Sequence, residues 1–310
     1  MKISVVVPTY NRSRFAARAI RSLTEQTLAP AEIIVVDNGS TDDTDAVLRD
    51  LAAMVGGLRH FVEPRLGVSV ARNRGATEAS GELVAFLDDD AVASHQWLEV
   101  LADAALHSPG AAALGGPIAL RWTRPAPAWM LGLESWYGQF DLGKERKTID
   151  YPVYPFASNL AFRREAFLSV GGFPVELGPR GRHRIPNEEN GLFRRVSERG
   201  GIVVYEPRAV VYHWVHAERL TRQYLLRRGF AQGRGDVLVD AIFAPSRTRI
   251  QRVQRSVDAV GDALGASRIS LTQRLRGNPM RALLAASTSL GRAVQEARIA
   301  TAPRQPQRGW

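Results

Sequence analysis

The chain of 310 residues contains no cysteine, which excludes disulfide bonds and thiolate metal sites. Any metal must therefore be held by oxygen ligands or by imidazole. No apolar run approaches the roughly 20 residues that a membrane-spanning helix needs, and the apolar part of the first eight residues is too short for a secretory signal. We therefore expect a cytoplasmic protein, with enough residues for one large or two modest domains.

Lysine is also scarce, since only 3 of the 41 basic residues are lysine. The net charge of +10 would favour nucleic-acid binding if it were spread over the chain. Residues 1–244, however, carry 29 basic and 28 acidic side chains, whereas residues 245–310 carry 12 arginines and three acids. The main body is nearly neutral, so we expect no nucleic-acid partner, and the basic tail is a separate question.

A triplet of aspartates closes the apolar run Leu83–Leu87. Asp88, Asp89 and Asp90 would repel one another by several kcal/mol unless a positive charge lay among them. Mg²⁺ and Mn²⁺ prefer oxygen ligands, so the triplet predicts a divalent-cation site. The alternative is a solvated acidic turn that caps a helix beginning near Ser94.

Strand and helix patterns alternate through the first half of the chain. Their order predicts an α/β fold with a mainly parallel, doubly wound sheet, in which ligands bind beyond the carboxyl ends of the strands. The predicted strands are Ile3–Val7, Glu32–Val36, Leu58–Val62 and the run before the aspartates. The predicted helices are Arg14–Gln26, a capped helix through Val47 and Leu51 after a turn at Asn38–Asp42, and Ser69–Glu78. Pro8, Thr9, Tyr10, Asp37 and the aspartate triplet fall at those strand ends.

Four ordered segments carry a family resemblance: Val5–Arg12, Ile33–Asp42, Gly67–Gly75 and Phe86–Asp90. Together they resemble the signatures of inverting nucleotide-sugar glycosyltransferases of family 2, which have the GT-A fold, over about residues 1–240. The resemblance implies a nucleoside-diphosphate-sugar donor, usually with uridine, and Mg²⁺ or Mn²⁺ on its diphosphate. It divides the chain into a nucleotide-sugar-binding half (1–115), an acceptor-binding and catalytic-base half of the same domain (116–244) and a basic helical extension (245–310).

The resemblance places the donor beside the first two strands. Tyr10 would stack on the base, which is worth on the order of 1 kcal/mol, unless it is a core aromatic. Pro8 and Thr9 would present backbone groups to the base, and Asp37 would accept a hydrogen bond from the base or ribose. Arg72 and Asn73 would line the donor cleft, with Arg72 pairing with phosphate, with Asp37, or in a surface salt bridge.

The same resemblance assigns the cation. Asp88 or Asp89 would hold the ribose, and Asp90 would ligate the metal that neutralises the departing diphosphate. His213 follows an apolar run, where an imidazole could be a second metal ligand or an ordinary structural histidine.

Acceptor-side residues follow in the second half of the chain. Asn159, on a predicted strand, would contact the donor sugar or the acceptor. An inverting transfer needs one carboxylate to take the proton of the acceptor hydroxyl, and Glu189 matches that position. Glu188 reads better as a cap or dipole partner at a helix N-terminus. The family commonly has Glu-Asp where this chain has Glu-Glu.

Two further segments leave alternatives open. Aromatic residues between Ile118 and Phe156 fit either a lid over a sugar acceptor or a satellite core. The tail has two amphipathic patterns, which could dock on the catalytic domain or lie on anionic lipid at the inner face of the plasma membrane: Val253, Val257, Val260 and Leu264, then Met280, Leu283, Leu284, Leu290 and Val294. Residues from Thr301 to Trp310 read as disordered.

The predicted function is metal-dependent, inverting transfer of a sugar from a nucleoside-diphosphate-sugar, with UDP as the expected nucleotide, to a hydroxyl of a glycan or lipid-linked acceptor. Scarce lysine and abundant alanine are typical of GC-rich bacterial genomes and favour a role in cell-surface polysaccharide synthesis. One alternative is a catalytically inactive protein that binds sugar nucleotides or glycans. A nucleotidyltransferase would need a Gly-rich, Lys-containing phosphate loop, which Pro8–Asn11 does not provide.

Overall fold

The computed structural model describes residues 1–181, 185–243, 247–273 and 279–301. Their contacts divide them into two compact units. The first contains the described residues of 1–126, 132–181 and 188–217, and the second contains those of 127–131, 185–187 and 218–301. The expected boundaries at 115/116 and 244/245 stay predictions.

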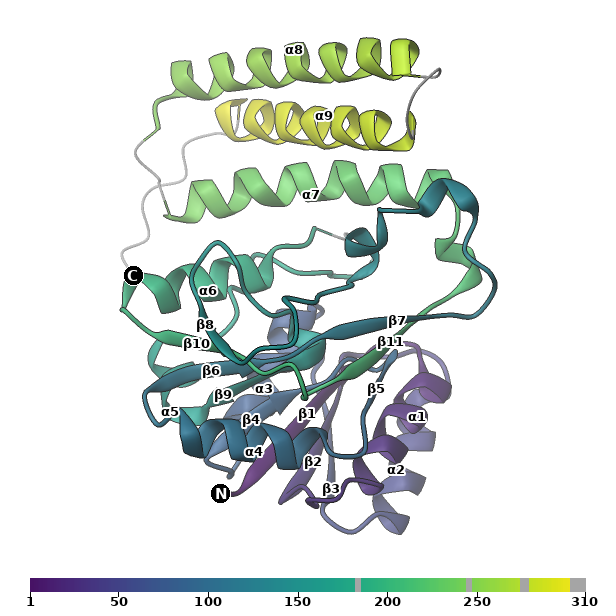
Figure 1. The fold of residues 1–310 in the computed structure, drawn as a ribbon, viewed down its shortest axis with the longest axis vertical. Helices are drawn as coiled ribbons and strands as arrows, with labels where there is room; N and C mark the ends of the chain where they lie inside the picture. Colours follow the sequence, from purple (N-terminus) through teal and green to yellow (C-terminus); the bar gives the residue numbers. More distant parts are fainter. Residues whose placement is uncertain (182–184, 244–246, 274–278, 302–310) are drawn as a thin grey trace. The chain divides into compact units, whose positions relative to one another are not determined.

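An eight-stranded sheet forms the centre of the first unit (Figure 1). Its order is β3-β2-β1-β4-β9-β6-β10-β8, in which β9 is antiparallel to both neighbours and β8 is antiparallel to β10. The strands are β1 (Ile3–Thr9), β2 (Glu32–Asp37), β3 (Leu58–Val62), β4 (Leu83–Phe86), β6 (Ala111–Gly115), β8 (Lys147–Ile149), β9 (Leu160–Arg163) and β10 (Ile202–Tyr205). The predicted α/β class and mainly parallel sheet are confirmed.

Helices cover both faces of this sheet, which explains why β1, β2 and β4 are apolar runs rather than alternating patterns. One apolar cluster joins the sheet to α1 (Ser13–Thr24), α2 (Thr44–Met54) and α4 (Trp97–His107). The other joins it to α3 (Val68–Glu78), α5 (Arg164–Ser169) and α6 (Glu188–Glu198). The three predicted helices of the first half are confirmed as α1, α2 and α3.

A three-stranded sheet continues from the aspartate triplet. It contains β5 (Ala91–Ala93), β11 (Val211–Val215) and β7 (Ile118–Trp122), with His213 on β11 opposite Ala91 on β5. Short 3₁₀ turns lie at Ala128–Met130, Glu134–Tyr137, Ala157–Asn159 and Ala217–Arg219. Asn159 therefore ends a 3₁₀ turn just before β9, and its predicted place on a strand is wrong.

The second unit is dominated by α7 (Arg222–Phe243), α8 (Arg249–Gln273) and α9 (Pro279–Thr301), with α9 packed between the other two (Figure 1). Glycine permits the close approach, because a Cβ at Gly233 or Gly291 would collide with backbone carbonyls of the facing helix. Met280 and Leu284 of α9 are buried. Residues 302–310, which include most of the segment expected to be disordered, lie outside the described residues.

The α8 stripe differs from this buried face. It comprises Ile250, Val253, Val257, Val260 and Leu264, which lie at heptad spacing and are all exposed, Ile250 by 81% and Val257 by 60%. Among the described helices, none is both long and apolar enough to cross a membrane. The stripe is therefore an exposed apolar face on a helix that does not span a bilayer.

Candidate functional site

The aspartate triplet lies where β4 ends and β5 begins, beside the carboxyl end of β1. Thr9, the last residue of β1, donates its Oγ1 hydrogen to Asp89 Oδ2 at 2.8 Å. Asp89 and Asp90 are about 5% exposed, whereas the side chain of Asp88 is 27% exposed. The strand pairing thus brings the β1 turn and the triplet together, as the parallel sheet predicted.

Arg12 joins two of these carboxylates and was not identified from the sequence. Its Nη1 donates to Asp89 Oδ1 and to Asp90 Oδ2, each at 2.9 Å. Burial, together with the charge of Asp90, raises the pKa of Asp89 to about 6 against the opposing effect of Arg12. The available signal was the presence of an arginine in the loop between β1 and α1, at the edge where the aspartates were expected.

His213 faces the other oxygen of Asp90. Its Nδ1 lies 3.2 Å from Asp90 Oδ1, and both side chains are largely buried. The pairing of β11 with β5 produces this approach, because Trp214 N also donates to the backbone oxygen of Asp90 at 2.9 Å. The two residues predicted as metal ligands are therefore neighbours.

Arg72 connects the triplet to the predicted base. From α3, its Nη2 donates to Asp88 Oδ1 at 2.7 Å, and its Nη1 donates to Glu188 Oε1 at 2.9 Å. The side chain is only 4% exposed, so the surface-salt-bridge alternative is wrong. The expected partner Asp37 is also wrong, since Arg72 binds Asp88 and Glu188 instead.

Glu188 and Glu189 open α6, as predicted. Glu188 is buried against Arg72, and the backbone N–H of Ala157 donates to Glu189 Oε1 at 3.3 Å. Loss of solvation, followed by the charge of Glu188, raises the pKa of Glu189 to about 7 although Arg72 opposes the shift. The two adjacent carboxylates therefore have different environments. Glu188 is neutralised by its ion pair with Arg72, whereas the pKa of Glu189 lies near neutral pH.

The residues expected around the nucleoside lie at the ends of β1 and β2. Tyr10 is 37% exposed, which places it outside the core, and Pro8 is buried within β1. Asp37 is 1% exposed and accepts a hydrogen bond from the backbone N–H of Ser40 at 3.0 Å. Asp37 also forms a possible cation-binding group with Asp45 and His60, whose ligand atoms lie within 4.8 Å of one another.

The side chains of Asn159 and Asn73, the two predicted asparagines, form hydrogen bonds with backbone groups of the protein. Asn159 is fully buried; its Oδ1 accepts from Trp97 Nε1, and its Nδ2 donates to the carbonyl oxygens of Pro117 and Ala209. Asn73 exchanges two hydrogen bonds with the backbone of Phe173. Because these bonds use both amide donors of Asn159, a direct contact with a sugar would require them to break, so the structure favours a positioning role.

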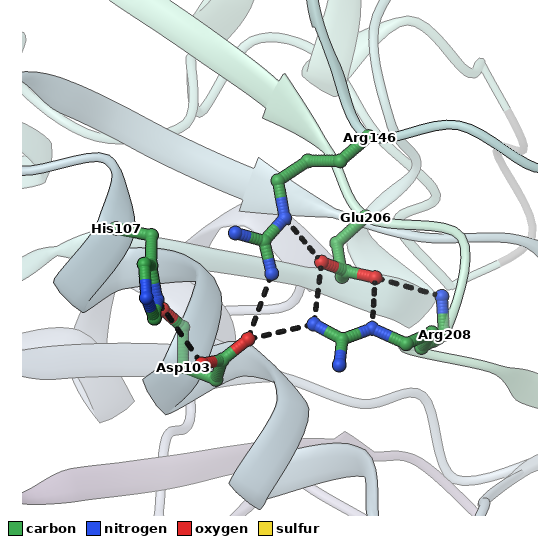
Figure 2. Close-up of polar contacts among 5 residues, drawn as sticks. All are labelled: Asp103, His107, Arg146, Glu206 and Arg208. Atoms are coloured by element: carbon green, nitrogen blue, oxygen red, sulfur yellow. Dashed lines mark hydrogen bonds and ion pairs between the residues drawn. The ribbon is translucent and has the colours of Figure 1, made fainter.

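A separate polar cluster lies on α4 and around the end of β10 (Figure 2). Glu206, which is 1% exposed, accepts from Arg146 at 2.5 Å and from Arg208 at 2.9 Å, and both arginines also reach Asp103. Burial opposes ionisation of Glu206, but the hydrogen bonds from Arg208 and Arg146 outweigh it and lower its pKa. Two acids balance two bases here, so the cluster anchors the segment before β8 and offers no unmatched charge for a ligand.

Aromatic residues of the second half pack mostly on one another. Tyr154 stacks on Phe193 of α6 with ring centroids 5.4 Å apart, and Phe140 contacts Phe156 at 5.5 Å and Tyr205 at 5.9 Å. This packing favours the satellite-core interpretation for these rings.

Comparison with known proteins agrees with this architecture. A family model described as glycosyl transferase family 2 matches residues 4–171. A glucosyl-dolichyl phosphate glucuronosyltransferase of Haloferax volcanii is 30% identical, over 78% of this chain and 79% of its own. A GalNAc(5)-diNAcBac-PP-undecaprenol beta-1,3-glucosyltransferase of Campylobacter jejuni is 41% identical over 29% of each chain. A mannosyltransferase of Pyrobaculum calidifontis, solved with GDP-Man and Mn²⁺, shares the fold with a TM-score of 0.58 and 20% identity, over 98% of this chain and 76% of its own.

Proposed function

The chain belongs to glycosyl transferase family 2, and on that basis we propose that it transfers a sugar, with inversion, from a nucleoside-diphosphate-sugar to a hydroxyl of a lipid-linked or glycan acceptor. One observation carries the proposal: Arg72 ties Asp88, in the aspartate triplet, to Glu188, the neighbour of Glu189. Groups suited to bind the donor and to activate the acceptor are thus joined by one buried side chain.

The donor would lie along the ends of β1, β2 and β4. Tyr10 offers an exposed ring for stacking on the base, with Pro8 and Thr9 beside it and Asp37 as an acceptor. For the ribose we favour Asp88 over Asp89, because the side chain of Asp88 is 27% exposed whereas that of Asp89 is 7% exposed. Uridine is the proposed base.

Asp90 and His213 fit a divalent cation. Neighbouring ligands of an octahedral Mg²⁺ or Mn²⁺ ion lie about 3 Å apart, given bond lengths of roughly 2.1 Å, and the Asp90 Oδ1 to His213 Nδ1 separation is 3.2 Å. When bound, the cation would neutralise charge on the departing diphosphate. The group of Asp37, Asp45 and His60 is the second candidate for a cation, and we favour Asp90 and His213 because Asp37 is assigned to the nucleoside.

Glu189 would be the general base. A pKa near 7 lets the carboxylate be ionised at neutral pH and still basic enough to accept a proton. The acceptor oxygen would attack the anomeric carbon while the bond to the diphosphate breaks, and the hydroxyl proton would pass to Glu189. Glu188, held by Arg72, would keep the base oriented and its pKa high.

The acceptor class follows from the relatives. The Haloferax and Campylobacter proteins are named for dolichyl phosphate and undecaprenol-linked sugars, which supports a lipid-linked acceptor in cell-surface polysaccharide synthesis. We propose that the protein is cytoplasmic and touches the inner face of the plasma membrane through the α8 stripe, whose exposed apolar residues match an interfacial helix. The +9 charge of residues 245–310 would favour anionic lipid.

A screen of nucleotide sugars tests the proposal. Wild-type protein should release nucleoside diphosphate from one of them only with Mn²⁺ or Mg²⁺ present, and Glu189→Gln should bind that donor without turning it over. A wild-type protein that binds a donor but never releases diphosphate, with or without a prenyl-phosphate-linked sugar, would identify an inactive binding protein instead.

A further inference from the structure

The loop that contains Arg12 holds the backbone of this residue beside the proposed cation site. Asn11, directly after Tyr10, has a positive φ of 53° and turns the chain between β1 and α1. Its Oδ1 accepts from the backbone N–H of Thr41 at 2.7 Å, and Arg12 N donates to Thr44 Oγ1 at 3.1 Å. The turn before α2 therefore holds the backbone of Arg12 in place, and only the side chain is left to move.

The guanidinium occupies the space between two carboxylates. Each aspartate has one oxygen satisfied by the protein, from Thr9 for Asp89 and facing His213 for Asp90, and presents the other oxygen to Arg12 Nη1. Burial alone would lower the pKa of Arg12, but the charges of Asp89 and Asp90 raise it above its ordinary value. The guanidinium of Arg12 thus supplies positive charge where a cation would supply it, and Arg18 also lies close enough to Asp90 for their charges to interact.

We propose that the Arg12 guanidinium takes the place of a divalent cation in the donor-free protein, where it forms ion pairs with Asp89 and Asp90. When a divalent cation binds, Arg12 leaves these carboxylates and pairs with the diphosphate of the donor. This inference rests on the proposed function. A divalent ion at Asp90 and a guanidinium 2.9 Å from the same carboxylate would repel each other strongly. The diphosphate offers Arg12 a new anionic partner, so nucleotide and cation would bind together and each would be weak alone.

The partial exposure of Arg12 supports this exchange. Its side chain is 28% exposed, whereas those of Asp89 and Asp90 are 7% and 5% exposed. The arginine can therefore turn toward solvent-accessible space while the carboxylates stay in place. Arg72 contrasts with it, because that side chain is 4% exposed and has no such freedom.

Mn²⁺ binding measured without activity tests the inference. The free-ion electron paramagnetic resonance signal would report the Mn²⁺ affinity of wild type, Arg12→Gln and Arg12→Lys, each alone and with UDP or GDP. We expect Arg12→Gln to bind Mn²⁺ about tenfold or more tightly without nucleotide, because a competing charge is gone. Arg12→Lys should stay near wild type, and the nucleotide should increase Mn²⁺ affinity far more in wild type than in Arg12→Gln.

The control is Arg74→Gln, which removes an exposed arginine that pairs with Glu78 on α3 and should not change Mn²⁺ affinity. If Arg12→Gln has a lowered melting temperature, Arg12→Met keeps the apolar stem and replaces it. Arg12→Gln that binds Mn²⁺ no more tightly than wild type overturns the inference, even if wild-type turnover depends on Mn²⁺. Tighter Mn²⁺ binding in a protein that releases no diphosphate would support the inference and count against the proposed function.

Discussion

Arg72 Nη1 lies 2.9 Å from Glu188 Oε1, so α3 is tied to α6, the helix that carries the proposed base. The same guanidinium binds Asp88, 100 residues earlier in the chain. Phe173 lies under the guanidinium, 5.3 Å from ring centroid to Cζ, and its backbone is held by Asn73. The donor side and the acceptor side of the site are therefore positioned by adjacent residues of α3.

Removal of this tie should destabilise the protein. In Arg72→Gln the buried carboxylate of Glu188 loses its counter-charge, and breaking a buried ion pair from one side costs about 3–5 kcal/mol. Urea unfolding would measure the change in the free energy of unfolding. Arg74→Gln is the matched control on the same helix, because Arg74 is 42% exposed and its ion pair is with Glu78, one turn further along α3; its effect should stay within about 1 kcal/mol. Equal effects of the two variants would contradict the importance assigned to Arg72.

Substitution of the base should separate binding from chemistry. Glu189→Gln keeps size and polarity but cannot take a proton, so kcat should fall by roughly 10² or more. Donor affinity, measured by calorimetry, should change little. Glu188→Gln should lower kcat less, because its carboxylate pairs with Arg72 rather than facing the acceptor. A larger loss in Glu188→Gln would mean that the two roles are reversed.

The pH dependence follows from the raised pKa of Glu189. Because the base must be ionised, kcat should rise with pH through an apparent pKa near 7. The charge of Glu188 is one cause of the upward shift, so Glu188→Gln removes a repulsion and should move the rising limb to lower pH. A pH–rate profile of both proteins checks this. A limb that stays in place, or moves to higher pH, would assign the titration to another group.

The sequence predicted the fold of the first half well, because each element there has a local signal. The buried strands are uninterrupted apolar runs, and the helices between them have clear spacing, so the meeting of Thr9, Asp37 and the triplet at one sheet edge followed from parallel topology alone. The exact position of a residue within its element depends on packing neighbours that cannot be deduced from the spacing of residues in the sequence. Asn159 looked like a strand residue but ends a 3₁₀ turn with a saturated side chain.

Ion-pair partners were the feature that the sequence predicted least well, because the partner of a side chain depends on segments that are distant in the sequence. Arg72 was expected to pair with phosphate, with Asp37 or in a surface salt bridge; among protein groups it binds Asp88 and Glu188, the latter 116 residues away. The loop of Arg12 was expected at the same sheet edge as the triplet, but the sequence does not show that its side chain pairs with Asp89, 77 residues later.

Loss of the proposed metal ligand should abolish turnover and leave the fold intact. Asp90 lies at a strand end and not in an apolar cluster, so Asp90→Ala should keep the wild-type circular dichroism spectrum and lose Mn²⁺-dependent release of diphosphate. Excess chelator should silence wild type to the same extent. Full activity of Asp90→Ala, or of wild type in chelator, would remove the metal from the mechanism.

The α8 stripe should decide whether the protein contacts lipid. Deletion of residues 246–310 is a poor test, because α9 packs on α7 and its loss would uncover that helix and lower the melting temperature.

A point variant is cleaner: Val257→Asp puts a charge into the stripe, whereas Gln251→Asp adds the same charge at an exposed position outside it. In sedimentation with anionic vesicles, wild type and Gln251→Asp should pellet at low salt and less so at high salt, because the basic tail contributes. Val257→Asp should stay in the supernatant, since burial of the apolar stripe is lost. Wild-type protein that stays in the supernatant at low salt would exclude the lipid contact and leave docking as the role of the tail.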